Sequence, residues 1–207
     1  DPDIHLWDVA TGEMVATLTG HTDGVGALAF HPSGEWLVSG AWQFDGTLRL
    51  WKIVDDNGEL TSIIEKQFYA GVTDIDFNSD GSILAVSVSD NRRSDGAEVY
   101  TILFEDVLEG ITNYTSVDGS TIQSLAVSYH PTLPRFAYTV FARMGIWDTE
   151  NNKSLFNGQL ISAQTIYDLE YDPTGTYLAI YSSTGEILFW DATTHEKLFI
   201  ITSVSES

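Results

Sequence analysis

One pattern recurs four times along the chain, and it limits the possible folds more than any other feature. An alternating apolar stretch ends in an aromatic residue and leads into a turn, with the aromatic at Phe30, Phe77, Tyr129 and Tyr171. These residues lie roughly 42 to 52 positions apart, and a period in this range indicates similar structural units that pack against one another. The sequence therefore predicts a repeat fold rather than a single irregular core.

The repeats read as strands. Side chains alternate between the two faces of a strand, so Val25 and Ala27 lie on one face and Leu28 and Phe30 on the other. Both faces are apolar, which favours a sheet packed between two neighbouring sheets. Turn formers recur at one place in three repeats, as Pro32-Ser33-Gly34, Ser79-Asp80-Gly81 and Pro173-Thr174-Gly175. We therefore expect four short antiparallel strands per repeat, in the first repeat at about 25–31, 36–40, 47–53 and 59–68. The stretch nearest to a helix is 103–108.

The most complete repeat also carries a set of short motifs. They are Gly20-His21, Ser39-Gly40, Asp45-Gly46-Thr47 and Trp51, and the later repeats close on Trp147-Asp148 and Trp190-Asp191. With this spacing the whole chain resembles the WD-repeat β-propeller family. In the second repeat Tyr100 stands where the resemblance leads us to expect a tryptophan. The resemblance implies an all-β propeller of four-stranded blades.

The repeats also set the expected organisation. We expect a half blade at 4–19 and four complete blades at about 25–68, 72–116, 122–160 and 166–203, all in a single propeller domain or a fragment of one. The half blade has only the third and outer strands of a blade, so its first two strands are missing. We therefore expect further sequence upstream and a larger ring of seven or eight blades.

His21, Ser39, Asp45 and Trp51 invite two interpretations. A serine, a histidine and an aspartate can form a hydrolytic triad. The resemblance implies instead a structural tetrad, in which the histidine bridges the serine and the aspartate and the serine meets the indole N–H. No nucleophile-elbow glycine pattern surrounds Ser39, and no zinc-binding histidine motif is present, so we expect neither catalytic nor metal-binding residues. We expect no cofactor either.

The charge balance limits the partners. The net charge is −21, from nine Lys and Arg against thirty Asp and Glu. This charge repels phosphate backbones and anionic lipid, so we expect protein or peptide partners, preferably basic, and neither nucleic acid nor membrane. The alternative interpretation of the charge is solubility alone. The sequence has no cysteine, no visible signal peptide and no apolar run long enough to span a membrane, which leaves the compartment open.

A second acidic feature suggests a rival function. Asp74 and Asp76 share a strand face, as do Asp168, Glu170 and Asp172. They lie on or beside the inner strands, which line the channel of a propeller. They form either a solvated channel wall or an acidic channel that binds a cation or another ligand, as a propeller enzyme would use.

One loop departs from the family pattern. Between Ala41 and Gly46 the family has a short turn, but here Trp42, Gln43 and Phe44 are inserted. Two large aromatics in a loop can anchor a partner, or Trp42 can fold back over the neighbouring blade. The equivalent loop of the next repeat carries Arg92 and Arg93, a rare basic spot. We therefore predict a non-enzymatic scaffold for protein or peptide partners, with these four residues as contacts. The alternatives are the acidic-channel function and a regulatory domain of a larger multidomain protein.

Overall fold

The computed structural model describes residues 1–53, 61–68, 70–89, 97–109, 115–117, 126–140, 142–160 and 165–202. These residues form one two-stranded and four four-stranded sheets, all antiparallel. The first sheet consists of β1 (Ile4–Trp7) and β2 (Met14–Leu18). The others consist of β3 (Val25–Phe30), β4 (Trp36–Ala41), β5 (Thr47–Lys52) and β6 (Thr61–Gln67); β7 (Gly71–Phe77), β8 (Ile83–Ser89), β9 (Ala97–Leu103) and β10 (Thr115–Val117); β11 (Val127–Tyr129), β12 (Arg135–Val140), β13 (Arg143–Asp148) and β14 (Lys153–Leu160); and β15 (Ile166–Tyr171), β16 (Tyr177–Ser182), β17 (Ile187–Asp191) and β18 (Lys197–Ile201).

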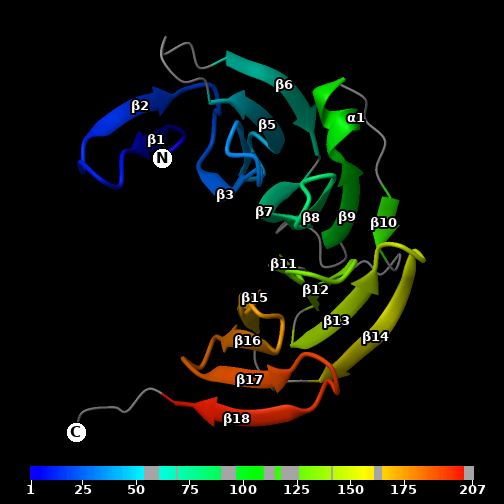
Figure 1. The fold of residues 1–207 in the computed structure, drawn as a ribbon. Coiled ribbons are helices and arrows are strands. Elements are labelled where there is room, and N and C mark those ends of the chain that lie inside the picture. The colour runs from blue at the N-terminus through cyan, green and yellow to red at the C-terminus, as the bar shows by residue number, and fades with distance from the viewer. Residues whose placement is uncertain are drawn as a thin grey trace, which may run out of the picture.

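The sheets lie side by side in an arc, each with its first strand nearest the centre (Figure 1). Every four-stranded sheet is a meander in which consecutive strands pair. Strand β7 packs against β3 and β4, and β11 contacts both β7 and β15. This is the predicted propeller arrangement of four blades and a half blade, and the fold class is confirmed. The short helix α1 (Phe104–Leu108) between β9 and β10 coincides with the stretch that came nearest to a helix in the sequence.

The core lies between the sheets rather than within one of them. Val38 and Leu50 of the first full blade pack in one cluster with Val72 and Val86 of the second blade. Each of these four side chains is fully buried. Burying an aliphatic side chain contributes roughly 1.5–3 kcal/mol, so the contact between blades is a main source of stability.

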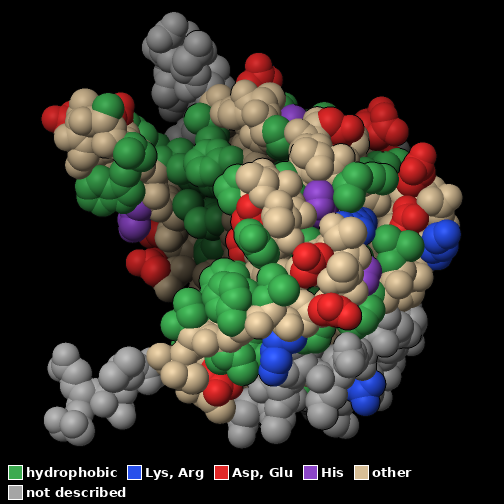
Figure 2. All heavy atoms as spheres, turned by 60° about the horizontal axis from the view of Figure 1, so that its bottom comes forward, with side chains coloured by type: hydrophobic (Ala, Val, Ile, Leu, Met, Phe, Trp, Pro, Cys, Tyr) green, Lys and Arg blue, Asp and Glu red, His purple; other side chains and the backbone are tan. Residues whose placement is uncertain are grey.

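Apolar side chains are also exposed near the two ends of the arc, on the first full blade and on the last sheet. They include Leu28 and Phe30 on β3, and Tyr167, Tyr181 and Phe199 on the last sheet. Figure 2 shows hydrophobic side chains gathered on the walls of the hollow at the open side of the arc. Equivalent faces are buried between neighbouring sheets elsewhere in the arc.

Two histidines link neighbouring blades at the turns that follow the inner strands. The His31 ring covers Gly81 in the turn of the next blade, where a Cβ atom would lie 2.1 Å from its Nε2. His130 repeats this contact two interfaces further on, between the third and fourth blades, and its Nε2 lies 3.1 Å from the carbonyl oxygen of Gly175. Both glycines have a positive φ, which side chains other than that of glycine rarely adopt. The interface between the second and third blades has Asn78 in place of this histidine, as the register of the turns shows.

The register corrects one detail of the second blade. In the first full blade Trp51 lies opposite Leu37. In the second blade Leu84 takes the place of Leu37, since each pairs with the last aromatic of its inner strand, and Leu84 lies opposite Ile102. The residue that replaces the tryptophan is therefore Ile102, and the prediction that Tyr100 does so is wrong. The aromatic at Tyr100 drew attention in the sequence, although it lies two positions too early.

Candidate functional site

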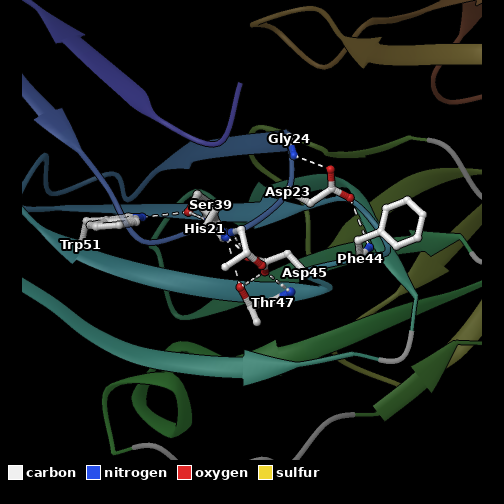
Figure 3. A network of polar contacts seen from close by, with 9 residues as sticks. His21, Asp23, Gly24, Ser39, Phe44, Asp45, Thr47 and Trp51 are labelled. Atoms are coloured by element: carbon white, nitrogen blue, oxygen red, sulfur yellow. Dashed lines mark hydrogen bonds and ion pairs between the residues drawn. The ribbon is translucent and has the colours of Figure 1, made fainter.

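The structure brings His21, Ser39, Asp45 and Trp51 together in the first full blade (Figure 3). The Nε2 atom of His21 lies 2.7 Å from Oγ of Ser39, and its Nδ1 lies 3.3 Å from Oδ1 of Asp45. The indole N–H of Trp51 donates to the same Ser39 Oγ at 2.8 Å. Ser39 lies on β4 and Trp51 on β5, so these contacts link the loop between β2 and β3, which carries His21, to both strands.

The Ser39 hydroxyl is poorly placed for nucleophilic attack. Its side chain is fully buried at 0% exposure, and its oxygen is already bound by the imidazole and the indole. A nucleophile must reach its substrate, whereas this oxygen is surrounded by its own blade. The arrangement satisfies polar groups inside the protein, as expected for buried hydrogen-bonding groups.

Asp45 is the centre of a wider set of contacts. Its carboxylate accepts hydrogen bonds from the backbone N–H of Thr22 at 2.5 Å and of Thr47 at 2.9 Å, and also from the Thr47 hydroxyl. Burial alone would raise the pKa of Asp45, but the bonds from Thr47, Thr22 and His21 outweigh it and hold the pKa below its ordinary value. Sequence reasoning missed Thr22 and the Thr47 hydroxyl, although Thr47 follows directly after the Asp45-Gly46 turn that drew attention to Asp45.

The other blades replace this network with different side chains. The position of Ser39 is held by Val86 in the second blade and by Ile180 in the fourth, and in the third by Tyr138. Within the described residues, the indole N–H groups of Trp147 and Trp190 are buried and have no hydrogen-bond partner. The complete tetrad geometry is therefore a feature of the first full blade in the described part of the chain.

The aromatic insert lies in the loop between β4 and β5. Trp42 is 40% exposed and Phe44 is 80% exposed. The Trp42 indole covers Gly24 and Gly26, at whose positions a Cβ would lie 3.2 and 3.3 Å from indole carbons. The Trp42 backbone N–H donates to the carbonyl oxygen of Gly24 at 2.9 Å. Trp42 thus leans over the inner strand of its own blade, while Phe44 projects outward.

Two carboxylates hold this loop against the preceding one. Asp23 accepts hydrogen bonds from the backbone N–H of Gly24 at 2.8 Å and of Phe44 at 3.2 Å (Figure 3). Asp45, in the same loop as Phe44, in turn accepts the backbone N–H of Thr22, in the same loop as Asp23. Each loop therefore supplies a carboxylate that binds the backbone of the other, and the backbone that carries Phe44 is fixed. Sequence reasoning missed Asp23, although Asp23-Gly24 is a turn-forming pair. Arg92 and Arg93 lie outside the described residues.

The acidic residues of the inner strands do not all face solvent. Oδ2 of Asp74 accepts the backbone N–H of Val127 at 2.8 Å, and Oδ2 of Asp76 accepts that of Tyr129 at 2.7 Å. The two carboxylates of β7 therefore bind β11 of the next blade. Burial raises the pKa of Asp74 to about 7 and that of Asp76 to about 6, although these backbone bonds act in the opposite direction.

The remaining acidic residues lie nearby on the last inner strand. Asp168 and Glu170 are exposed as whole residues, but the partial desolvation of their carboxyl groups raises the pKa of both. The charge of Asp168 also helps to raise the pKa of Asp74. Asp172 instead binds its own turn, where hydrogen bonds from Thr174 and Tyr177 lower its pKa to about 2. Among the described residues, no three His, Asp or Glu side chains lie close enough to hold a metal ion.

No helix in the described parts of the chain has the length and apolar character needed to cross a membrane.

Comparison with known proteins adds a family match and several relatives. The family model described as "WD domain, G-beta repeat" matches residues 12–52 and 59–93. The periodic tryptophan protein 2 homolog of Neurospora crassa is 39% identical over 92 residues, which are 44% of this chain and 10% of that protein. Striatin of Mus musculus is 29% identical over 199 residues, which cover 92% of this chain and 24% of striatin. Pre-mRNA-processing factor 19 of Mus musculus is 27% identical over 158 residues, covering 76% of this chain and 29% of that protein. The chain thus spans less than a third of the length of each of these relatives.

Proposed function

We propose that this chain, which belongs to the WD-repeat β-propeller family, is a non-enzymatic scaffold that binds partner proteins or peptides. The blades form a stiff framework through their buried contacts, and the loops between the strands are the surfaces that can vary without loss of the fold. Within this framework we assign His21, Ser39, Asp45 and Trp51 a structural role. We assign partner contact to the aromatic insert and to Arg92 and Arg93 of the next repeat.

The observation that carries the proposal is that Phe44 has an exposed side chain on a loop whose backbone is held in place. Its side chain is 80% exposed, while its backbone N–H is bound by Asp23. An exposed aromatic on a fixed loop loses little conformational freedom when a partner covers it, and aromatic residues dominate the binding energy of many interfaces. Trp42, in the same loop, is 40% exposed and adds a second aromatic side chain.

The charge of the chain supports basic partners. A net charge of −21 attracts basic surfaces and repels nucleic acid. One relative is named a pre-mRNA-processing factor. We propose that this chain contributes to any comparable process through protein contacts rather than through direct contact with RNA.

The geometry gives less support to the acidic-channel alternative. Asp74 and Asp76 each bind the backbone of β11 through Oδ2, so a cation at these carboxylates would compete with a contact between blades. The Ser39 hydroxyl is fully buried and bound on two sides. Both features favour a scaffold over a hydrolase or a cation-dependent enzyme.

A display experiment tests the proposal. Peptides from a random library are selected on the purified chain, and the affinity of the selected peptides is then measured for Phe44→Ala and for Tyr177→Ala. Tyr177 is an exposed aromatic at the opposite end of the strands, on the last blade. We expect Phe44→Ala to weaken binding by about tenfold or more, as for a hot-spot aromatic, and Tyr177→Ala to leave it unchanged. Equal effects of the two substitutions, with unchanged thermal stability, would contradict a role for this loop.

A further inference from the structure

A pocket of about 390 Å³ lies between the second and third blades. Ile83, Leu103 and Asp106 line it from the second blade, and Trp147, Thr149 and Asn152 from the third. Ile83 begins β8 and Asn152 lies in the turn between β13 and β14, so the pocket is at the end of the sheets opposite the aromatic insert. It is therefore separate from the surface of the proposed function.

The register shows which side chains fill the same place in the neighbouring interfaces. The first residue of the second strand is Trp36 in the first full blade, Ile83 in the second and Arg135 in the third, each opposite the residue at the equivalent position of the third strand. Trp36 reaches the next blade and packs edge to face against the ring of Phe104, with 6.3 Å between the two ring centroids. Arg135 also reaches its next blade, where its Nη2 donates to the carbonyl oxygen of Ala192 at 2.9 Å.

The middle interface lacks such a side chain. Ile83 is much shorter than tryptophan or arginine, so it leaves space where Trp36 and Arg135 fill it. Asn78, at the place of His31 and His130, turns back on its own loop: its Oδ1 accepts the N–H of Ile83 at 2.9 Å and its Nδ2 donates to Ser82 at 3.1 Å. The short side chain of Ile83 thus leaves this pocket open.

The residues that line the pocket indicate which kind of ligand it would bind. Thr149 follows Asp148 as Ala192 follows Asp191, so Thr149 holds the place of the residue that accepts the Arg135 guanidinium. Asp106 is the one charged side chain among the described residues that line the pocket. Three threonines, Thr101, Thr115 and Thr149, add hydroxyl groups that can accept hydrogen bonds. Ile83 and Trp147 supply apolar walls, on which a flat guanidinium packs better than an ammonium group does.

We propose that this pocket binds an arginine side chain of a partner protein, which takes the place that Arg135 occupies in the next interface. The guanidinium pairs with Asp106 and with oxygen acceptors of the third blade, and its stem packs on Ile83 and Trp147. The strongly acidic surface of the chain attracts a basic segment to this position.

The proposal is tested on the full chain with small probes. N-acetyl-arginine-N-methylamide is titrated while the backbone and indole N–H resonances are followed by NMR, beside the matched citrulline, lysine and tryptophan derivatives. Citrulline has nearly the same shape as arginine without its charge. We expect saturable shifts at Trp147, Thr149 and Asn152 with the arginine probe, in the millimolar range usual for one side chain, and at least about tenfold weaker binding of citrulline.

Four variants sharpen the test. Ile83→Arg supplies a guanidinium from the same position as Arg135, and should fold and abolish binding of the probe. Asp106→Asn should weaken binding severalfold, whereas Glu105→Gln, which removes the same charge from the adjacent exposed position, should not. Phe44→Ala should leave the arginine shifts unchanged, which separates this site from the aromatic insert. The proposal is overturned if the arginine probe causes no saturable shifts, or if citrulline binds as tightly as arginine. It is also overturned if the tryptophan probe binds more tightly than arginine, or if Ile83→Arg and Asp106→Asn bind the arginine probe as the parent does.

Discussion

Asp23 and Asp45 each bind the backbone of the loop that carries the other. Asp23 accepts the N–H of Phe44 at 3.2 Å, and Asp45 accepts the N–H of Thr22 at 2.5 Å. Hydrogen bonds from backbone donors to ionised carboxylates are stronger than those between neutral groups. The pair therefore holds two loops of the first full blade in one arrangement, with the Phe44 side chain left outside it.

This reciprocal contact gives the first prediction. Asp23→Ala removes the hydrogen bond between its carboxylate and the N–H of Phe44, while Asp45 still holds the two loops together through Thr22. We therefore expect a loss of only about 1 kcal/mol in the free energy of unfolding. Binding of the peptides selected on the chain should fall severalfold, because Phe44 would no longer be fixed before binding. Urea denaturation and a titration with one such peptide measure the two effects. Glu13→Ala, at an exposed position in the loop between β1 and β2, is the control. A large loss of stability with unchanged affinity would show that Asp23 serves the fold alone.

The second prediction concerns the buried tetrad. His21→Ala leaves Ser39 and Asp45 without their imidazole partner, and we expect the free energy of unfolding to fall by on the order of 1–3 kcal/mol. Chemical denaturation checks this value. His5→Ala, on an exposed side chain of β1, should cost much less. A hydrolase activity that disappears in His21→Ala, with stability equal to that of the parent, would instead support the catalytic interpretation.

Several features of this molecule follow from the sequence because they are local. The turns at Pro32-Ser33-Gly34 and Pro173-Thr174-Gly175 and the alternation in Val25–Phe30 each involve a few consecutive residues, and the strands form where they indicate. The tetrad was reached differently, since its four residues lie far apart and only the resemblance to the family placed them together. Their contacts are formed as that resemblance implies.

Other features depend on how whole sheets pack, which local patterns do not contain. The bond from Asp74 to Val127 joins residues that are 53 positions apart, and it exists because β7 and β11 lie side by side at the centre. Nothing near Asp74 in the sequence distinguishes this carboxylate from a solvated one. The pocket beside Ile83 is likewise visible only after Trp36 and Arg135 are seen to fill the equivalent places.

The third prediction concerns the turn glycines. Gly81→Ala introduces a Cβ that would lie 2.1 Å from Nε2 of His31, at a residue with φ +79°. Gly34→Ala has nearly the same φ, +75°, but its Cβ would meet no atom within 4 Å. The control therefore measures the backbone strain alone, about 1 kcal/mol, and Gly81→Ala should cost a further 1–3 kcal/mol or so because the His31 ring must move. Equal losses in urea denaturation would contradict the close contact between the two blades.

The last prediction is a dependence of stability on pH that arises from Asp74 and Asp76. Their pKa values in the folded chain, about 7 and about 6, lie above the ordinary value of 3.8, so between these limits the folded state binds more protons than the unfolded state. The contribution of these groups is therefore fully present below about pH 3.8 and is lost as the pH rises through their folded values. The nearby carboxyls of Asp168 and Glu170, whose pKa values are also raised, act in the same direction.

We therefore expect these four groups to make the free energy of unfolding fall as the pH rises from about 5 to about 8. One pKa unit corresponds to about 1.4 kcal/mol, so the loss should be measurable by urea denaturation at several pH values. Asp74→Asn cannot ionise and should flatten this dependence. Because an amide offers one oxygen where the carboxyl group accepts bonds from both Ile75 and Val127, the variant should be less stable than the parent at pH 5 and close to it at pH 8. Asp80→Asn, in an exposed turn where hydrogen bonds lower the pKa of the carboxyl, is the matched control and should keep the slope of the parent. A parent whose stability rises steadily over this range would mean that Asp74 and Asp76 stay ionised against β11, and that their charge stabilises the contact between the blades.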